Sequence, residues 1–91
     1  MSILDEAHNA VHVSRRQDYD HPSTSFTRLA GIWTAMLKHL LKDEAELTPE
    51  MANLMLIAFK VSREIAKPKR DNRIDIAGYA ETLEMQYEDN N

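Results

Sequence analysis

Residues 48–66 read TPEMANLMLIAFKVSREIA, and this segment indicates the fold class most directly. Thr48 offers a hydroxyl that can cap a helix, Pro49 suits the first helical position, and Glu50 places an acid in the first turn. A Lys-Pro pair follows the segment and marks its end. These signals predict a helix over about 49–66.

This predicted helix is apolar on two faces. One face carries Leu54, Ala58, Val61 and Ile65, and the opposite face carries Ala52, Leu56 and Phe59. A helix that is apolar nearly all round is normally buried on both sides. We therefore expect it to be the central helix of the domain, with Leu56 and Phe59 covered by a second copy of the chain. The chain is then a homo-oligomer, a dimer at least.

Three further helices are predicted, over about 2–13, 25–42 and 72–87. Ser2 and Asp5 can cap the first, and Asp71 or Asn72 the last. The second has apolar residues at intervals of three and four, which is typical of an amphipathic helix: Phe26, Leu29, Ala30, Trp33, Leu37, Leu40 and Leu41. No segment alternates apolar and polar residues with period two. The sequence thus predicts an all-α fold, a four-helix bundle-like single domain over residues 1–91, completed by oligomerisation.

The last helix separates an apolar side from a side that carries its acids. Ile76, Ala80, Leu83 and Tyr87 share the apolar side, and Asp71, Asp75, Gly78 and Thr82 share the other. Glycine costs a helix interior about 1 kcal/mol relative to alanine. Gly78 therefore suggests that another backbone or a ligand approaches closely beside Asp75.

Charge is distributed unevenly along the chain. The formal net charge is −4, yet six of the eleven basic residues lie between Lys60 and Arg73. A local basic zone on an acidic protein suits a small anion better than a long polyanion, so general nucleic-acid binding is not expected. The sequence has no cysteine, no long apolar run and no pattern of a signal peptide, which predicts a cytoplasmic protein without a membrane partner.

Two pairs of charged residues are the main candidates for a site. Asp71 and Asp75 could hold Mg²⁺, which often uses one or two carboxylates together with substrate phosphates. Alternatively they only cap the helix and complement its dipole. Lys60 and Arg63 could grip phosphate oxygens, or could instead form ion pairs with the two aspartates.

Other polar groups give weaker signals. Lys67, Lys69 and Arg70 precede a helix N-terminus, where anions are favoured, but a solvated linker is the simpler explanation. His8 and His12 lie one turn apart, and without a neighbouring catalytic glutamate they are only a weak zinc signal.

The chain resembles a small family of phage and prophage proteins of unknown function. The resemblance covers nearly the whole chain and depends on Arg16-Gln17-x-Tyr19, Pro22, Phe26, Trp33, Leu47-Thr48-Pro49-Glu50, Lys60-x-x-Arg63 and Asp71-Asn72-x-x-Asp75-Ile76-Ala77-Gly78-Tyr79. More distantly, the order of these motifs is similar to phage nucleotide-modification-associated domains and to the MazG-like all-α nucleoside triphosphate pyrophosphohydrolases.

The distant resemblance implies a nucleotide ligand and a magnesium cofactor. Asp71 and Asp75 match the second carboxylate pair of the pyrophosphohydrolases, Lys60 and Arg63 would bind phosphates, and Arg16 and Tyr19 would close over the ligand. The Glu-x-x-Glu of an earlier helix is missing, because residues 26–41 contain no acid. This departure leaves it open whether the chain is an enzyme.

Two functions are therefore predicted. The first is a phage-encoded nucleotide-binding protein acting in the host cytoplasm, in its fullest form a Mg²⁺-dependent nucleotide pyrophosphohydrolase. The alternative is a non-catalytic accessory or anti-defence protein that binds a host protein or sequesters a signalling nucleotide.

Overall fold

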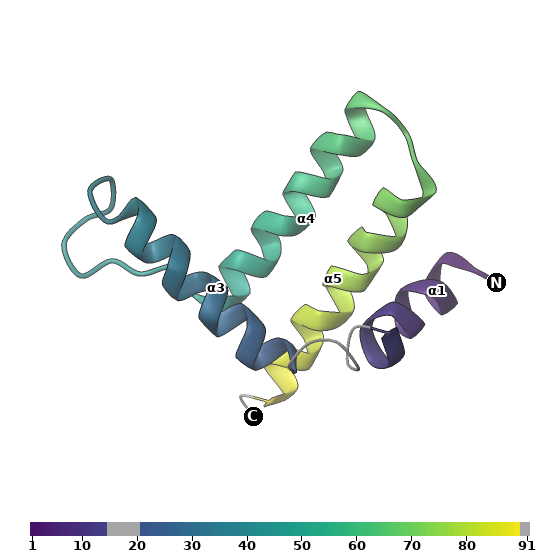
Figure 1. Cartoon of the computed structure of the whole chain (residues 1–91), viewed down its shortest axis with the longest axis horizontal. Helices are drawn as coiled ribbons and strands as arrows, with labels where there is room; N and C mark the ends of the chain where they lie inside the picture. Colours follow the sequence, from purple (N-terminus) through teal and green to yellow (C-terminus); the bar gives the residue numbers. More distant parts are fainter. Residues whose placement is uncertain (15–20, 90–91) are drawn as a thin grey trace.

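The structure is a computed structural model that describes residues 1–14 and 21–89. All its regular elements are helical, and the described residues contain no strand. In chain order they are α1 (Ile3–Asn9), the π-helical turn η1 (Ala10–Ser14), α3 (Pro22–Leu37), α4 (Pro49–Ala66) and α5 (Arg70–Asp89) (Figure 1). The prediction of an all-α fold is confirmed.

Local capping explains where these helices begin. The Ser2 hydroxyl accepts the backbone N–H of Asp5, whose carboxylate in turn accepts the N–H of Ser2. Thr48 caps α4 in the same way by accepting the N–H of Met51. These bonds satisfy donors that a helix start leaves free.

The second helix starts and ends earlier than its apolar pattern predicts. It begins at Pro22 because Nδ1 of His21 accepts the N–H of Ser23, which makes His21 the cap and Pro22 the first helical residue. It ends at Leu37, so Leu40 lies in the following turn and is exposed instead of belonging to the core stripe. The loop that follows is tied back by Thr34, whose hydroxyl accepts the N–H of Leu47.

The central helix is α5 and not α4, contrary to the sequence-based expectation. Helix α5 packs against α1, η1, α3 and α4, whereas α4 contacts only α3 and α5. Figure 1 shows α4 and α5 as an antiparallel pair, with α1 beside α5 on the side away from α4. The expectation failed because α5 buries polar side chains, which an apolar pattern does not reveal.

The seam between α4 and α5 is polar. Asn53 is fully buried, and its Nδ2 donates to the backbone carbonyl of Tyr79 at 2.7 Å. Its Oδ1 accepts from the hydroxyl of Thr82 at 2.6 Å and from Nε2 of Gln86 at 3.1 Å. Helix α5 thus turns inward the side that carries Gly78 and Thr82, while Tyr87 on its apolar side is 47% exposed.

A small apolar core fills the angle between α3, α4 and α5. Phe26, Ala30 and Ala52 are buried there, and Phe26 meets the ring of Tyr79 edge to face at 6.4 Å between centroids. The partly buried residues around them are Leu29, Trp33, Leu47, Leu56 and Tyr79.

The two apolar faces of α4 are used differently from the prediction. Ala52 and Leu56 pack within the chain, whereas the opposite face is exposed. Leu54, Val61 and Ile65 on that face are 43%, 42% and 80% exposed. We call Leu54, Ala58, Val61 and Ile65 the α4 stripe. Among the described residues, no helix is long and apolar enough to cross a membrane.

Candidate functional site

Lys60 of α4 and Asp75 of α5 form an ion pair across the helix interface. Nζ of Lys60 lies 2.8 Å from Oδ2 of Asp75, and the two side chains are only 18% and 20% exposed. The structure thus joins one predicted phosphate ligand to one predicted metal ligand. Because the pair is largely shielded from water, removal of either partner would leave the other as a poorly solvated charge, so each depends on the other.

Phe59 sits at the centre of a cationic surface next to this pair. Its ring is 50% exposed, with Cζ of Arg63 at 5.4 Å from the ring centroid and Nζ of Lys60 at 5.9 Å. Both cations lie within the range of attraction to an aromatic face. Because Phe59 was predicted to lie on a buried face, neither its exposure nor its two cationic neighbours were expected.

Asp71 lies one turn before Asp75 on α5. Helix α5 begins at Arg70, so Asp71 is an exposed residue of the first turn and not the cap. Asn72, the other predicted cap, is instead buried, and its Nδ2 donates to the carboxylate of Glu64 and to the carbonyl of Lys67. Asp75 pairs with Lys60 and is not a first-turn acid.

Glu64 organises the turn between α4 and α5. Its Oε1 accepts the backbone N–H of Lys69 at 2.8 Å and the amide of Asn72 at 3.3 Å, and its Oε2 pairs with Arg73. The pKa of Glu64 is held below its ordinary value, mainly by the hydrogen bond from the Lys69 N–H and further by Arg73 and Asn72. Partial burial acts in the opposite direction and raises this pKa. Sequence reasoning missed this role, although an acid in the last turn of a helix opposes the helix dipole and is a usable signal.

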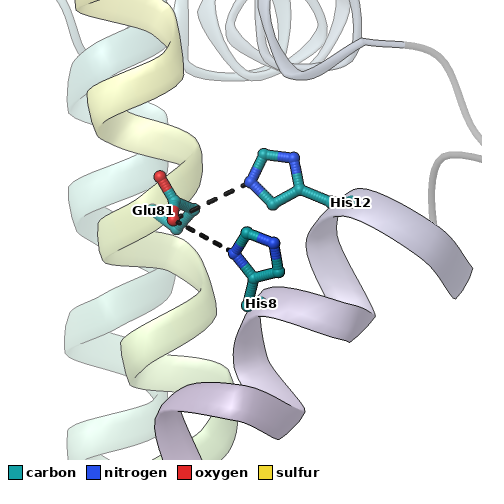
Figure 2. Close-up of side chains that lie close together, drawn as sticks. All are labelled: His8, His12 and Glu81. Atoms are coloured by element: carbon teal, nitrogen blue, oxygen red, sulfur yellow. Dashed lines mark ion pairs between the residues drawn. The ribbon is translucent and has the colours of Figure 1, made fainter.

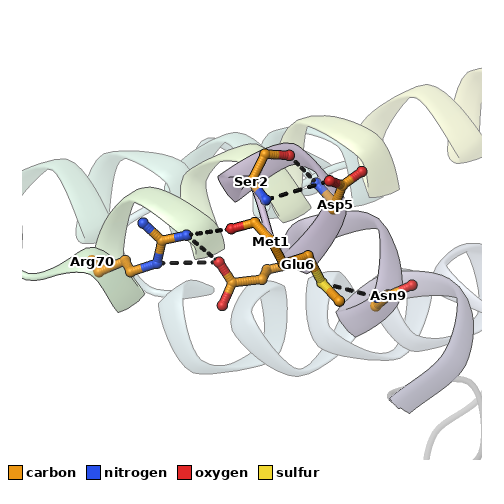
Figure 3. A network of polar contacts seen from close by, with 6 residues as sticks. All are labelled: Met1, Ser2, Asp5, Glu6, Asn9 and Arg70. Atoms are coloured by element: carbon orange, nitrogen blue, oxygen red, sulfur yellow. Dashed lines mark hydrogen bonds and ion pairs between the residues drawn. The ribbon is translucent and has the colours of Figure 1, made fainter.

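Much of the predicted basic zone is neutralised by acids. Arg70 pairs with Glu6 of α1 and also donates from Nη2 to the carbonyl of Met1 at 3.0 Å (Figure 3). With Arg73 on Glu64 and Lys60 on Asp75, three of the six cations have acidic partners. Arg63, Lys67 and Lys69 remain exposed at the same end of the molecule. The cationic surface that could bind an anion is therefore concentrated at Arg63 and the turn that follows α4.

Two predicted phosphate ligands cannot be compared with the structure. Arg16 and Tyr19 lie in 15–20, outside the described residues.

The aspartates do not assemble a multi-carboxylate centre within the described part of the chain. Over residues 1–14 and 21–89, groups of three or more His, Cys, Asp or Glu side chains suited to a metal occur at one place, which includes neither Asp71 nor Asp75. That place joins His8 and His12 to Glu81 of α5 (Figure 2). The histidine pair was noted in the sequence, but Glu81 was not, because it is distant in the chain.

Two curated relatives are similar over nearly the whole chain. The Gene 55 protein of Mycobacterium phage L5 is 36% identical over 85 residues, which cover 92% of this chain and 51% of that protein. The Gene 55 protein of Mycobacterium phage D29 is 33% identical over 93 residues, covering 97% of this chain and 55% of that protein. The chain therefore spans about half the length of these relatives. No solved structure matches it. A family model matches residues 2–86, and the chain accordingly belongs to the family described as a domain of unknown function, DUF6378.

Proposed function

We propose that the chain is the nucleotide-binding part of a phage protein and that the nucleotide lies over Phe59 at the α4–α5 face. The observation that carries the proposal is a half-exposed phenylalanine with the Arg63 and Lys60 cations 5.4 Å and 5.9 Å from its ring centroid. Base–aromatic stacking is worth about 1–3 kcal/mol per base and does not require a particular base. Arginine can bind phosphate oxygens through two parallel hydrogen bonds.

The Lys60–Asp75 pair gives this site a way to respond to a ligand. When phosphates approach, Lys60 exchanges the Asp75 carboxylate for a phosphate oxygen, and the Asp75 carboxylate coordinates Mg²⁺. Asp71, one turn earlier on α5, is the second carboxylate in this proposal, and Arg16 and Tyr19 close over the ligand. Magnesium commonly binds through one or two carboxylates together with substrate phosphates, so two aspartates are a sufficient protein contribution.

The proposal extends to hydrolysis of the bound nucleotide, with release of pyrophosphate. A bound Mg²⁺ would polarise a phosphoryl oxygen and lower the pKa of an attacking water. Helix α3 contains no acid, so this half-length chain offers one carboxylate pair where the pyrophosphohydrolases use two. Binding is accordingly the primary function proposed, and pyrophosphate release is tested beside it.

The experiment is a thermal-shift panel of nucleoside mono-, di- and triphosphates with and without Mg²⁺, followed by an assay for pyrophosphate. A ligand at about 100 times its dissociation constant should stabilise the fold by about 2.7 kcal/mol. Phe59→Ala and Arg63→Ala should each remove the shift, whereas Lys38→Ala, which removes an exposed cation at the end of α3, should keep it. Absence of any nucleotide shift would rule out the proposal.

Asp75→Asn separates the role of the ion pair from that of the metal. The amide keeps the shape and loses the charge, which leaves Lys60 without its carboxylate. Breaking a fully buried pair costs about 3–5 kcal/mol, and because this pair is partly exposed we expect about 1–3 kcal/mol of lost stability. Mg²⁺-dependent nucleotide binding should also disappear. Asp71→Asn is the matched control for stability and should cost below about 1 kcal/mol, since Asp71 is an exposed first-turn acid.

One observation favours the alternative, a non-catalytic protein that binds a host protein. The α4 stripe is apolar and exposed, and such surfaces mark interaction sites. Val61→Asp should abolish a stoichiometric complex recovered from host lysate while leaving nucleotide binding intact. Sequestration of a nucleotide would instead appear as tight binding with the ligand recovered unchanged.

A further inference from the structure

We propose that His8, His12 and Glu81 form a binding site for a divalent transition-metal ion, with zinc the expected ion. Oε2 of Glu81 lies 3.9 Å from Nδ1 of His8 and 3.8 Å from Nε2 of His12, and the three ligand atoms all lie within 4.8 Å of one another. In Figure 2 both rings point toward the Glu81 carboxylate, one above the other.

These distances suit a shared metal better than direct hydrogen bonds. A nitrogen–oxygen hydrogen bond is about 2.7–3.2 Å long, so both nitrogens are too far from the carboxylate for a good one. Donor atoms on a tetrahedral ion with bonds of about 2.0–2.1 Å lie about 3.4 Å apart. To reach that spacing, each nitrogen–oxygen distance must shorten by roughly half an ångström, and the two nitrogens, which lie within 4.8 Å, by up to about 1.4 Å, through rotations of the exposed side chains.

The backbone around the three residues is held in place. Ala7 and Val11 are 3% and 4% exposed, so α1 and η1 are docked firmly on α5. Val11 packs over Gly78, where a Cβ would lie 3.6 Å from Cγ2 of Val11. The contact between Val11 and Gly78 places η1 against the turn of α5 that precedes Glu81, which brings the histidines to this carboxylate.

The π-helical turn strengthens the proposal. His12 lies in η1, and wide turns of this kind occur frequently at functional sites. The two imidazole rings have centroids 4.4 Å apart, so two nitrogen donors lie together on the side of α1 and η1 that faces Glu81. Two histidines and one glutamate are also a known zinc ligand set, one that keeps a further position open.

The chemistry of the donors separates this site from the proposed magnesium site. Imidazole nitrogens favour zinc, copper, nickel and iron, whereas magnesium prefers oxygen ligands. The side chains are 61%, 32% and 36% exposed for His8, His12 and Glu81, so an ion can enter and retain water. An open pocket borders the site, lined by Leu4, Asp5, Ala7, His8, Ala77 and Glu81.

The test is calorimetric titration with Zn²⁺ of chain prepared without a polyhistidine tag, with Co²⁺ absorption as an independent readout of coordination. We expect one Zn²⁺ per chain, bound in the presence of excess Mg²⁺. His12→Ala and Glu81→Gln should each weaken binding by on the order of 100-fold, at least as much as loss of a supporting residue at a metal site. His39→Ala, which removes an exposed histidine elsewhere, should leave the affinity unchanged.

Circular dichroism should show that each variant is folded. If His12→Ala fails to fold, Glu81→Gln still tests the site, because glutamine has the size of glutamate. Equal Zn²⁺ affinity in wild type, His12→Ala and Glu81→Gln would overturn the proposal. So would a Co²⁺ spectrum of the hexa-aquo ion in the presence of folded wild type. Because Zn²⁺ binding is measured without nucleotide, its failure leaves the proposed nucleotide site untouched.

Discussion

At the scale of single residues, Glu64 offers a test through pH. Its pKa is lowered from an ordinary 4.5, first by the Lys69 N–H, so its ionised form is favoured in the folded state. A group with a lowered folded pKa stabilises the protein above its unfolded pKa and loses that contribution as the pH falls through the folded pKa. Glu64→Gln should therefore lower the thermal midpoint at neutral pH, and the difference from wild type should shrink as the pH falls below 4.5 and through the lowered pKa of Glu64. Glu84→Gln, an exposed acid of α5, is the control. A difference that stays constant with pH would contradict this role.

Candidate site residues that stand out within one helix were easier to predict than the contacts they make with other helices. Lys60 and Asp75 were predicted to pair as one of two alternatives, because each stood out within its own helix, and the structure brings them to 2.8 Å. Glu64 and Glu81 were missed because their partners come from other segments, and periodicity within one helix carries no information about them. Phe59 was placed on a buried face because α4 is apolar on several sides, and only packing shows which side is covered.

At the scale of helices, the two glycines provide a matched comparison. Gly31 in α3 has nothing within 4 Å of an added Cβ, and Gly78 in α5 would place its Cβ at an ordinary 3.6 Å from Val11. Both alanine variants should therefore gain helix stability, by up to about 1 kcal/mol each. Urea unfolding measures both. Gly31→Ala should show the full gain and Gly78→Ala an equal or smaller one, since Val11 must accommodate the methyl group. Destabilisation by Gly78→Ala would mean that α1 sits closer to α5 than the structure shows.

Helix boundaries were predictable where local chemistry sets them. Thr48 and Pro49 start α4 where the sequence indicates, because a cap and a first-position proline act within one turn. The orientation of α5 was not predictable from its apolar pattern. Its buried side carries Thr82 and Gln86, which both donate to Asn53 on another helix, a pairing that exists only once the two helices meet. Buried polar networks of this kind favour one register of two helices over others.

At the scale of the whole molecule, the chain is more open than a typical monomer of its size. Its accessible surface is 6299 Å² for 10.5 kDa, whereas a folded monomer of that mass exposes about 5,400 Å². The radius of gyration is 14.2 Å, against about 12 Å for a compact domain of this length. The matching family and relatives bear out the predicted phage family of unknown function.

We predict that a second copy of the chain covers the α4 stripe. The sequence had suggested instead that it covers Leu56 and Phe59. The excess surface is roughly 900 Å², close to the about 800 Å² that each partner buries in a standard interface. We expect a dimer at micromolar concentration by light scattering and sedimentation. Val61→Asp and Ile65→Lys should each shift it to monomer, because an unpaired charge would be buried at the interface. Met36→Lys, at an exposed apolar position of α3 away from the stripe, should remain dimeric. If wild type sediments as a monomer, the stripe must be covered by other means, and the half-length match to the relatives makes a further segment of a longer protein the first to test.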